Sequence, residues 1–484
     1  MTTKRRPSAS TIPSPGRRPS LTRLIVALPC LVAAAPAIAE DQDTQEQAAL
    51  APPASPHSGD LFTRDVLTGD WGGFRTKLED EGVTLGADSI DEAFGNPAGG
   101  VKQGAIYEGR LELVTTLDLG KLVDWSDATL HANAYQIRGR GLSANNLDGN
   151  LLTVSNIEAA RSLRLFDLWI EQVLLDGKLS LRVGQIAADD EFFVSQNSTS
   201  LINGTFGWPG IMGNDLPSGG PAYPLAAPGA RIKVATGKVT MLAAVLDGNP
   251  AGPGPGNPQR RNPSGTDFRL SDGPLAIAEI GYAINQETDA TGLPASYRLG
   301  GWYLNGAVAD QRFDMTGQSL AAPTSSGIPF KHQGDEGVYG VIDQGVWRDA
   351  EVKGRSAALF LRVSAAPSDR NLVSFYADAG VAVQGPIEGR GDDLLSFGLA
   401  VARIGDRARG LDGDTRHFTG IDLPIRDAEA AIEITYRSQV TPWWAVQPDL
   451  QVIVNPGGNV PLPGNPTHTV GTALVLGLRS AILF

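Results

Sequence analysis

Alternation of polar and apolar residues with a period of two is the feature that most constrains this fold. Between 428 and 437, Glu429 and Glu433 fall on one side of an extended chain, and Ile432 and Ile434 fall on the other. The same alternation recurs in 178–183, 357–363, 373–381 and 446–454. Such segments, bounded by Gly, Pro, Asn or Asp, are typical of β-strands with one polar and one apolar face. The sequence therefore predicts an all-β fold of antiparallel sheet from Val83 to the end.

The connections between these segments are of two kinds. Tight turns at 175–178 and 236–238 suit hairpins. Others are long and rich in Gly and Pro: 195–229, 248–274, 310–337 and 405–427. Short turns alternating with long loops are typical of a transmembrane β-barrel, although a secreted β-sandwich or lectin can show the same alternation.

The C-terminal strand favours the barrel. Leu474, Leu476, Leu478 and Ile482 share one face, and the chain ends at Phe484 on that face. An apolar outer stripe closed by a terminal Phe predicts an assembly signal for outer-membrane barrels, whereas an ordinary buried final strand would also be apolar. With about 25 residues per strand and connection, the chain after Leu78 accommodates about 16 strands, enough to enclose a water-filled lumen.

The N-terminus predicts export. Basic residues precede an apolar run, Leu24 to Ala35, and Ala37-Ile38-Ala39 supplies small residues for cleavage after Ala39. A cut before Cys30 would instead give a lipoprotein, but Pro29 occupies a position that favours a small residue. We therefore expect a signal peptide (1–39), a disordered acidic and Pro-rich leader (40–66), a short periplasmic amphipathic helix (67–82) and a barrel domain (83–484).

Composition excludes several classes of function. Removing the signal takes away the only cysteine and six basic residues, leaving 34 Lys and Arg against 53 Asp and Glu, a net charge of −19. Disulfide scaffolds, thiol chemistry and nucleic-acid binding are disfavoured. No two of the five histidines are closer than 51 residues, and no G-x-S-x-G motif occurs, so we expect no enzyme, no metal site and no cofactor.

Seven motifs, in order along the chain, resemble the carbohydrate-selective, OprB-type porins of the Gram-negative outer membrane. They are LTGDWGGFR at 67–75, RLFDLWIEQ at 164–172, VGQ with DEFF in 183–193, VIDQ at 341–344, DRN at 369–371, WW with PDLQ in 443–451, and NPGG at 455–458. The resemblance implies a 16-stranded channel, able to form a homotrimer, that admits sugars by diffusion past loops and a lining of arginines and acidic groups. The insertion at 248–263 and the long leader depart from the pattern.

Sugar hydroxyls are bound weakly by guanidinium forks, carboxylates and aromatic faces, so such side chains on the lumen face are the candidate site. An alternative role is a salt-bridge network that only keeps the wall neutral. The candidates are Arg110, Arg164, Asp167, Trp169, Glu171, Arg182, Glu279, Arg362, Arg390, Glu433, Arg437, Asp449 and Arg479.

Three further segments carry expectations. Asp189-Asp190-Glu191 predicts a solvated rim rather than a calcium site, because successive strand residues point to opposite sides. Trp443-Trp444 predicts an interfacial aromatic girdle. The loop after Phe193, which contains Trp208 and Tyr223, is the candidate to fold inward.

The sequence thus predicts an outer-membrane porin for passive, sugar-selective diffusion, with outer-membrane lipid and the barrel assembly machinery as partners. Two alternatives stay open at this point: a general porin selecting by size and charge, and a secreted β-protein that binds polysaccharide.

Overall fold

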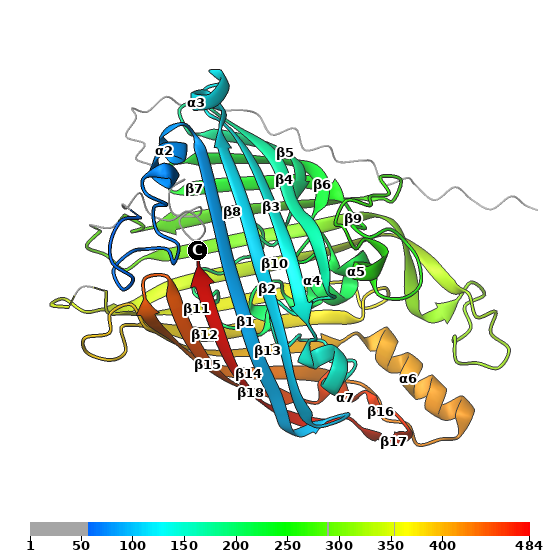
Figure 1. Cartoon of the computed structure of the whole chain (residues 1–484). Helices are drawn as coiled ribbons and strands as arrows, with labels where there is room; N and C mark the ends of the chain where they lie inside the picture. The colour runs from blue at the N-terminus through cyan, green and yellow to red at the C-terminus, as the bar shows by residue number, and fades with distance from the viewer. Residues whose placement is uncertain (1–56, 288–289, 353) are drawn as a thin grey trace, which may run out of the picture. The chain divides into compact units, whose positions relative to one another are not determined.

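Sixteen antiparallel strands close into a barrel in which β1 pairs with β18 and each other strand pairs with its neighbours along the chain (Figure 1). The computed structural model describes residues 57–287, 290–352 and 354–484. The predicted signal peptide and most of the predicted leader lie outside the described residues. The barrel confirms the all-β, 16-stranded prediction.

The barrel strands follow one another with no crossover. They are β1 (Val83–Gly100), β2 (Gly104–Asp118), β3 (Ala128–Gly139), β4 (Ser162–Leu174), β5 (Leu179–Ile186), β6 (Ala227–Thr236), β7 (Val239–Asp247), β8 (Pro274–Ile284), β9 (Ala295–Asp314), β10 (Pro329–Arg348), β11 (Ser356–Ala365), β12 (Val373–Gln384), β13 (Leu394–Ile404), β14 (Ala428–Thr441), β15 (Trp444–Val454) and β18 (Gly471–Leu483). A separate hairpin, β16 (Pro461–Leu462) with β17 (Asn465–Thr469), lies between β15 and β18.

The alternation read from the sequence separates the two faces of the wall. On β14, Glu429 and Glu433 are fully buried, whereas Ile432 and Ile434 are exposed. On β18, Arg479 is buried and Leu476 is half exposed. Polar residues therefore face the interior and apolar residues form the outer surface, as expected for a barrel surrounded by hydrocarbon.

Short connections gather at one end of the barrel and long ones at the other. Figure 1 shows α2 and α3 at the short-turn end, and α6 with the β16–β17 hairpin at the long-loop end. The predicted loop at 310–337 is largely wrong, because β9 and β10 extend as a hairpin to Asp314 and from Pro329.

Helices are few and short: α2 (Phe74–Asp80), α3 (Leu119–Val123), α4 (Gly210–Asp215), α5 (Pro258–Arg261), α6 (Asp406–Thr419) and α7 (Pro456–Asn459), with helical turns at Ser143–Leu147, Gly204–Phe206 and Pro217–Gly219. None of the described helices is long and apolar enough to cross a bilayer. The sequence did not predict α6 within 405–427. Only Ala408 of this helix is buried, so it has no apolar stripe to detect.

Candidate functional site

The segment 187–226, between β5 and β6, lies inside the barrel. Its apolar side chains pack against inward-facing aromatic residues of the far wall: Phe193 stacks on Tyr339 of β10 with ring centroids 4.1 Å apart, and Phe206 meets Phe360 of β11 at 6.0 Å. Phe193 and Phe206 are buried. The loop expected to fold inward therefore does so, and it fills much of the lumen beside β8 to β14.

Inward-facing acids hold the backbone of this loop. Glu433 accepts hydrogen bonds from the amides of Ile202 (2.5 Å) and Asn203 (2.9 Å). Glu279 accepts one from the amide of Phe193 (3.1 Å) and another from Tyr339. Carboxylates that accept backbone amide hydrogens form strong, directional bonds, so these acids fix the path of the loop.

Arg362 of β11 is the corresponding anchor for loop carbonyls. Its guanidinium donates to the carbonyls of Phe193, Thr205 and Gly207 at 2.9–3.0 Å. It also pairs with Asp378 at 2.6 Å, and both side chains are fully buried. Such a group has no surface left for a solute.

A second loop, 140–161 between β3 and β4, also lies inside the barrel. Glu429 accepts the amides of Leu151 and Leu152 at 2.7 and 2.8 Å. Arg479 bridges Glu92 of β1 and Asn156 of the loop, both at 2.5 Å.

The two loops are joined to each other. The amide of Asn156 donates to the carbonyl of Ile202, and the amide of Gly204 donates to that of Thr153, both at 2.8 Å. Together the loops form one partition inside the lumen. It bonds Glu92 of β1 as well as the far wall, and Glu191 and Tyr223 of the 187–226 loop pack on the remaining wall, β2 to β6.

Arg110 on β2 is the central cation of this remaining wall. It bonds Glu112 at 2.8 Å and Asp88 of β1 at 3.3 Å, and its guanidinium lies 4.8 Å from the ring of Tyr135 and 5.9 Å from that of Tyr223. Its side chain remains 16% exposed. Arg110 is thus held in place and is still accessible from the lumen.

A second cluster of charges lies on β4 to β6. Arg182 pairs with Glu171 at 2.6 Å, and Arg231 pairs with Glu191 at 2.7 Å and with Glu171 at 3.2 Å. Arg231 is almost fully buried. The cluster is a compact network in which each charge has a partner.

Trp169 has both faces covered. The guanidinium of Arg182 on β5 lies 3.8 Å from its ring, and His131 on β3 stacks on it at 4.7 Å. Because β3 and β5 flank β4 on opposite sides, the two contacts occupy opposite faces. Trp169 therefore offers no free face to a sugar, although its inward orientation follows the predicted parity.

The acidic run after β5 is only partly a solvated rim. Asp190 is exposed, but Glu191 is buried against Arg231, because the segment is a turn rather than a strand. Asp167 on β4 is buried close by, and one of its oxygens has no hydrogen-bond partner within the described residues. Burial, and then the charge of Asp190, raises the pKa of Asp189 to about 8.

Two other arginine candidates have structural partners. Arg164 is buried and donates to the carbonyls of Pro224 at 3.0 Å and Gln259 at 3.2 Å, so it holds loop segments. Arg390 lies in the β12–β13 turn and not on the inward face of a strand. There it bonds Asp393 and Ser438.

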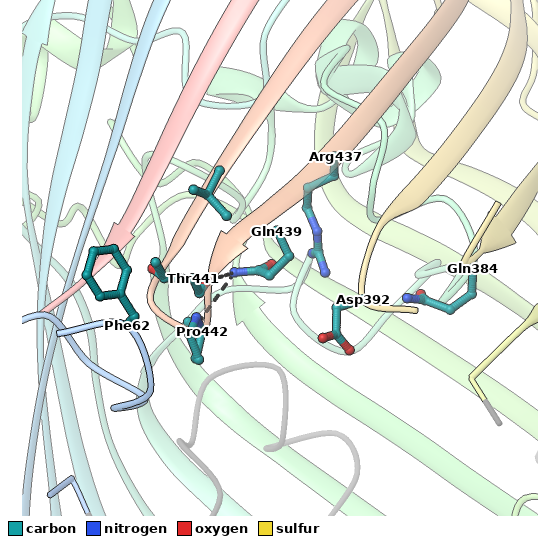
Figure 2. Close-up of a pocket in the computed structure, with 8 residues that line it drawn as sticks. Phe62, Gln384, Asp392, Arg437, Gln439, Thr441 and Pro442 are labelled. Atoms are coloured by element: carbon teal, nitrogen blue, oxygen red, sulfur yellow. Dashed lines mark hydrogen bonds between the residues drawn. The ribbon is translucent and has the colours of Figure 1, made fainter. Parts of the chain in front are cut away.

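Arg437 differs from all of these. It lines a cavity of about 510 Å³ at the short-turn end, together with Phe62, Gln384, Asp392, Gln439, Val440, Thr441 and Pro442 (Figure 2). Across the described part of the chain, no hydrogen bond or ion pair of its guanidinium is found. Asp449 lies deeper, on β15, and bonds Gln451 at 2.8 Å.

Comparison with known proteins identifies the family. The model of the carbohydrate-selective porin, OprB family, matches residues 102–484. The chain belongs to this family.

Relatives agree with the assignment. The porin is 27% identical over 452 residues to "Porin B" of Pseudomonas aeruginosa, covering 88% of this chain and 94% of the relative. It is 24% identical to "Putative porin QuiX" of Acinetobacter baylyi over 82% of this chain and 89% of that one. The high-pH structure of Pseudomonas putida OprB superposes with a TM-score of 0.78 at 25% identity, covering 88% of this chain and all of that one.

The porin is therefore a channel of the Gram-negative outer membrane that takes carbohydrate solutes. Because outer-membrane barrels have short periplasmic turns and long extracellular loops, the end that carries α6 faces outward and the end that carries α2 faces the periplasm. Within the described residues, no cluster of three potential metal ligands occurs.

The sequence did not reveal the 140–161 loop as part of the site, nor Asp88 and Tyr135 as neighbours of Arg110. A signal existed for Asp88 and Tyr135, because each has the parity of an inward residue. For the loop there was none, since its position depends on contacts such as Leu151 with Glu429, made between residues 278 positions apart.

Proposed function

We propose that sugars cross this porin by diffusion, with no chemical step, along the wall opposite the loop partition, and that Arg110 with Asp88 supplies the weak contacts. The observation that supports the proposal is the accessible guanidinium of Arg110, oriented by Glu112 and Asp88 beside two tyrosine rings. Guanidinium donors and carboxylate acceptors within reach of one another match the paired hydroxyls of a pyranose.

Four of the other candidates act by positioning the loops. The hydrogen-bonding groups of these four side chains already bind loop backbone or neighbouring side chains. They are Arg164, Glu279, Arg362 and Glu433. In this proposal they set the width of the passage rather than touch the solute. Arg437 lies further along, where solutes leave toward the periplasm.

The competing function is a general porin that selects only by size and charge. The sugar-selective and the general porin differ in whether the paired N–H donors of the Arg110 guanidinium contribute to the rate of sugar passage. Arg110→Lys keeps the positive charge between Asp88 and Glu112 but loses the planar pair of donors. A sugar-tuned passage should lose rate for glucose with this variant, whereas a size-limited one should not.

The test is uptake into liposomes that carry the purified porin, comparing glucose with a neutral amino acid of similar size. We expect faster glucose entry, and a several-fold slower glucose rate in Arg110→Lys with the amino acid unchanged. Arg348→Lys, an exposed arginine at the periplasmic end of β10, is the matched control. Equal entry of both solutes in every variant would reduce the function to size selection.

We also propose the processing and partners of the chain. A signal peptide is removed after Ala39, the assembly machinery binds the terminal strand that ends at Phe484, the outer surface contacts lipid, and the porin associates as a homotrimer. If the intact mass of the purified porin equals that of a chain starting at Glu40, the measurement supports the cleavage site. Loss of membrane-inserted protein in Phe484→Ala supports the assembly signal.

A further inference from the structure

The connection between β7 and β8, residues 248–274 and called here the strap, binds β4 near its extracellular end. Where the pairing of β5 with β4 ends, the amide of Leu165 on β4 donates to the carbonyl of Ser264 at 3.0 Å. Gln185 Nε2 on β5 donates to the carbonyl of Gly265 at 2.9 Å. A Cβ atom at Gly265 would lie 2.0 Å from the carbonyl oxygen of Leu165, so only glycine allows this approach. The strap therefore lies directly against β4.

One side chain folds the strap. The guanidinium of Arg261 donates to three strap carbonyls, each at 2.9 Å, those of Gly252, Gly254 and Gly256. These glycines have φ values of +62°, +154° and +78°, which let the chain wrap around the guanidinium. The neighbouring Arg260 is exposed, and its side chain has no hydrogen bond or ion pair among the described residues. Arg261 thus orders the Gly- and Pro-rich part of the strap, and Arg260 does not.

The strap contacts both loops of the partition. Gln259 Oε1 accepts a hydrogen bond from the amide of Ala160, in the first loop, at 2.6 Å. Ser218, in the second loop, donates to Asn249 Oδ1 at 2.6 Å. The strap is therefore a third segment that holds the two loops together from the extracellular side.

Arg164 couples the strap to the second loop from below. Its guanidinium donates to the carbonyl of Gln259 at 3.2 Å and to that of Pro224 at 3.0 Å, and its Nε donates to Ser162. The side chain is 1% exposed, and no acid pairs with it in the part of the chain that the structure describes. A buried guanidinium without a counter-charge depends on its carbonyl partners. Separating the strap from the loop would leave this charge with too few partners, so the two segments are held together.

Tyr223, the residue before Pro224, is the part of the second loop that reaches the proposed passage. Its ring lies 5.9 Å from the guanidinium of Arg110 and 5.4 Å from the ring of Tyr135. Its hydroxyl donates to the carbonyl of Ile157 in the first loop at 2.9 Å. The position of Tyr223 beside Arg110 therefore depends on Arg164, and through Arg164 on the strap.

We infer that the strap sets the upper size limit for sugars that pass Arg110. With the strap folded around Arg261, Tyr223 stays beside Arg110 and longer sugars are held back relative to monosaccharides. With the strap released, Tyr223 withdraws and the limit rises. Residues 248–263 are the insertion that departs from the OprB-type pattern, so we expect this limit to be a property of this chain. The inference rests on the proposed function, because it uses the passage along Arg110, and deepens it by assigning size selection to the strap.

The two adjacent arginines of α5 provide a matched test. Arg261→Ala and Arg260→Ala are compared with the wild type by liposome uptake of glucose, maltose and maltotriose. We expect the rate of maltose entry relative to glucose to rise at least threefold in Arg261→Ala and to stay at the wild-type value in Arg260→Ala. A purely structural loss would lower the uptake of every sugar and leave the ratio unaltered. An unaltered ratio in Arg261→Ala, or the same rise in both variants, would overturn the inference.

A reversible crosslink tests the strap within one folded protein. Ala160→Cys/Gln259→Cys replaces the hydrogen bond between strap and first loop by a disulfide, and the proposed mature chain has no other cysteine. We expect the wild-type ratio of maltose to glucose entry in the oxidised porin and a severalfold higher ratio after reduction, because the hydrogen bond is then missing. Equal ratios before and after reduction, or no disulfide at all, contradict the inference. A wild type without preference for glucose over a neutral amino acid would instead contradict the proposed function and leave the effect of reduction on the size ratio intact.

Discussion

Arg75 Nη2 lies 2.8 Å from the backbone oxygen of Phe484, so the helix that precedes the barrel is tied to the last residue of the chain. The same guanidinium reaches the carbonyls of Leu85 at 3.2 Å and Gly69 at 3.3 Å, and the side chain is only 4% exposed. The amide of Phe484 in turn donates to Ala87 of β1. The N-terminal segment therefore fastens the seam where β1 and β18 close the barrel.

Replacing Arg75 should weaken this seam. Arg75→Leu removes charged hydrogen bonds to three backbone carbonyls, which we expect to cost about 2 kcal/mol. The detergent-solubilised porin should then lose its barrel at a lower temperature, measured as the shift from compact to unfolded migration in gels. Lys77→Leu, on the exposed side of the same helix, should leave that temperature unchanged.

The wall of the barrel could be predicted from the sequence because strand alternation is local. Each inward or outward position follows from its neighbour two residues away, and Glu433 and Arg182 were placed correctly by parity alone. The partition inside the lumen could not be predicted in this way. Glu433 binds the amide of Ile202 and Arg362 binds the carbonyl of Thr205, contacts between residues far apart in sequence.

Parity also could not tell a solute-binding residue from an anchor. Arg110 and Arg362 are both inward arginines with an acidic partner, but Arg110 is partly exposed and Arg362 is fully buried beneath the 187–226 loop. Only the position of the loop separates their roles. Trp169 is a similar case, since its stacking partners lie on two other strands.

Releasing the loop at one anchor should widen the channel. Glu433→Ala removes the acceptor of two amide hydrogen bonds and should cost about 2 kcal/mol of anchoring, which raises the population of released loop more than tenfold. We expect larger and noisier single-channel conductance and faster entry of disaccharides. Glu388→Ala, in an exposed periplasmic turn, is the control. Unchanged conductance in Glu433→Ala would mean that the other anchors hold the loop alone.

Ion selectivity should depend on pH through Asp189. Because burial raises the pKa of this acid to about 8, it is mostly neutral at pH 6 and mostly ionised at pH 9. Raising the pH through this range adds a negative charge beside the passage, so the preference for cations over anions should increase. Reversal potentials across planar bilayers measure this preference. Asp189→Asn should flatten the pH dependence, and an unaltered pH profile in that variant would assign the effect to another group.

Because the folded porin favours the protonated, neutral form of Asp189, this residue also makes the free energy of unfolding depend on pH. Its pKa in the folded porin exceeds that of an unfolded Asp, so the folded state holds a proton that the unfolded state has lost between about pH 4 and pH 8. This contribution is present below that range and is lost as the pH rises through 8. We expect the unfolding temperature to fall less between pH 6 and pH 9 in Asp189→Asn than in the wild type.

Arg437 should favour solutes that carry a carboxylate. Its guanidinium faces the cavity of Figure 2 without a hydrogen-bonded partner in the described residues, and Phe62 and Asp392 also line this cavity. A charge pair about 4 Å apart in water is worth about 1 kcal/mol, so Arg437→Gln should slow an acidic sugar such as glucuronate about fivefold relative to glucose. Arg390→Gln, whose guanidinium is already paired with Asp393 near that end of the barrel, should have a smaller effect. The measurement is liposome uptake of the two sugars at low salt. An equal loss for both sugars would show that Arg437 shapes the exit rather than attracts charge.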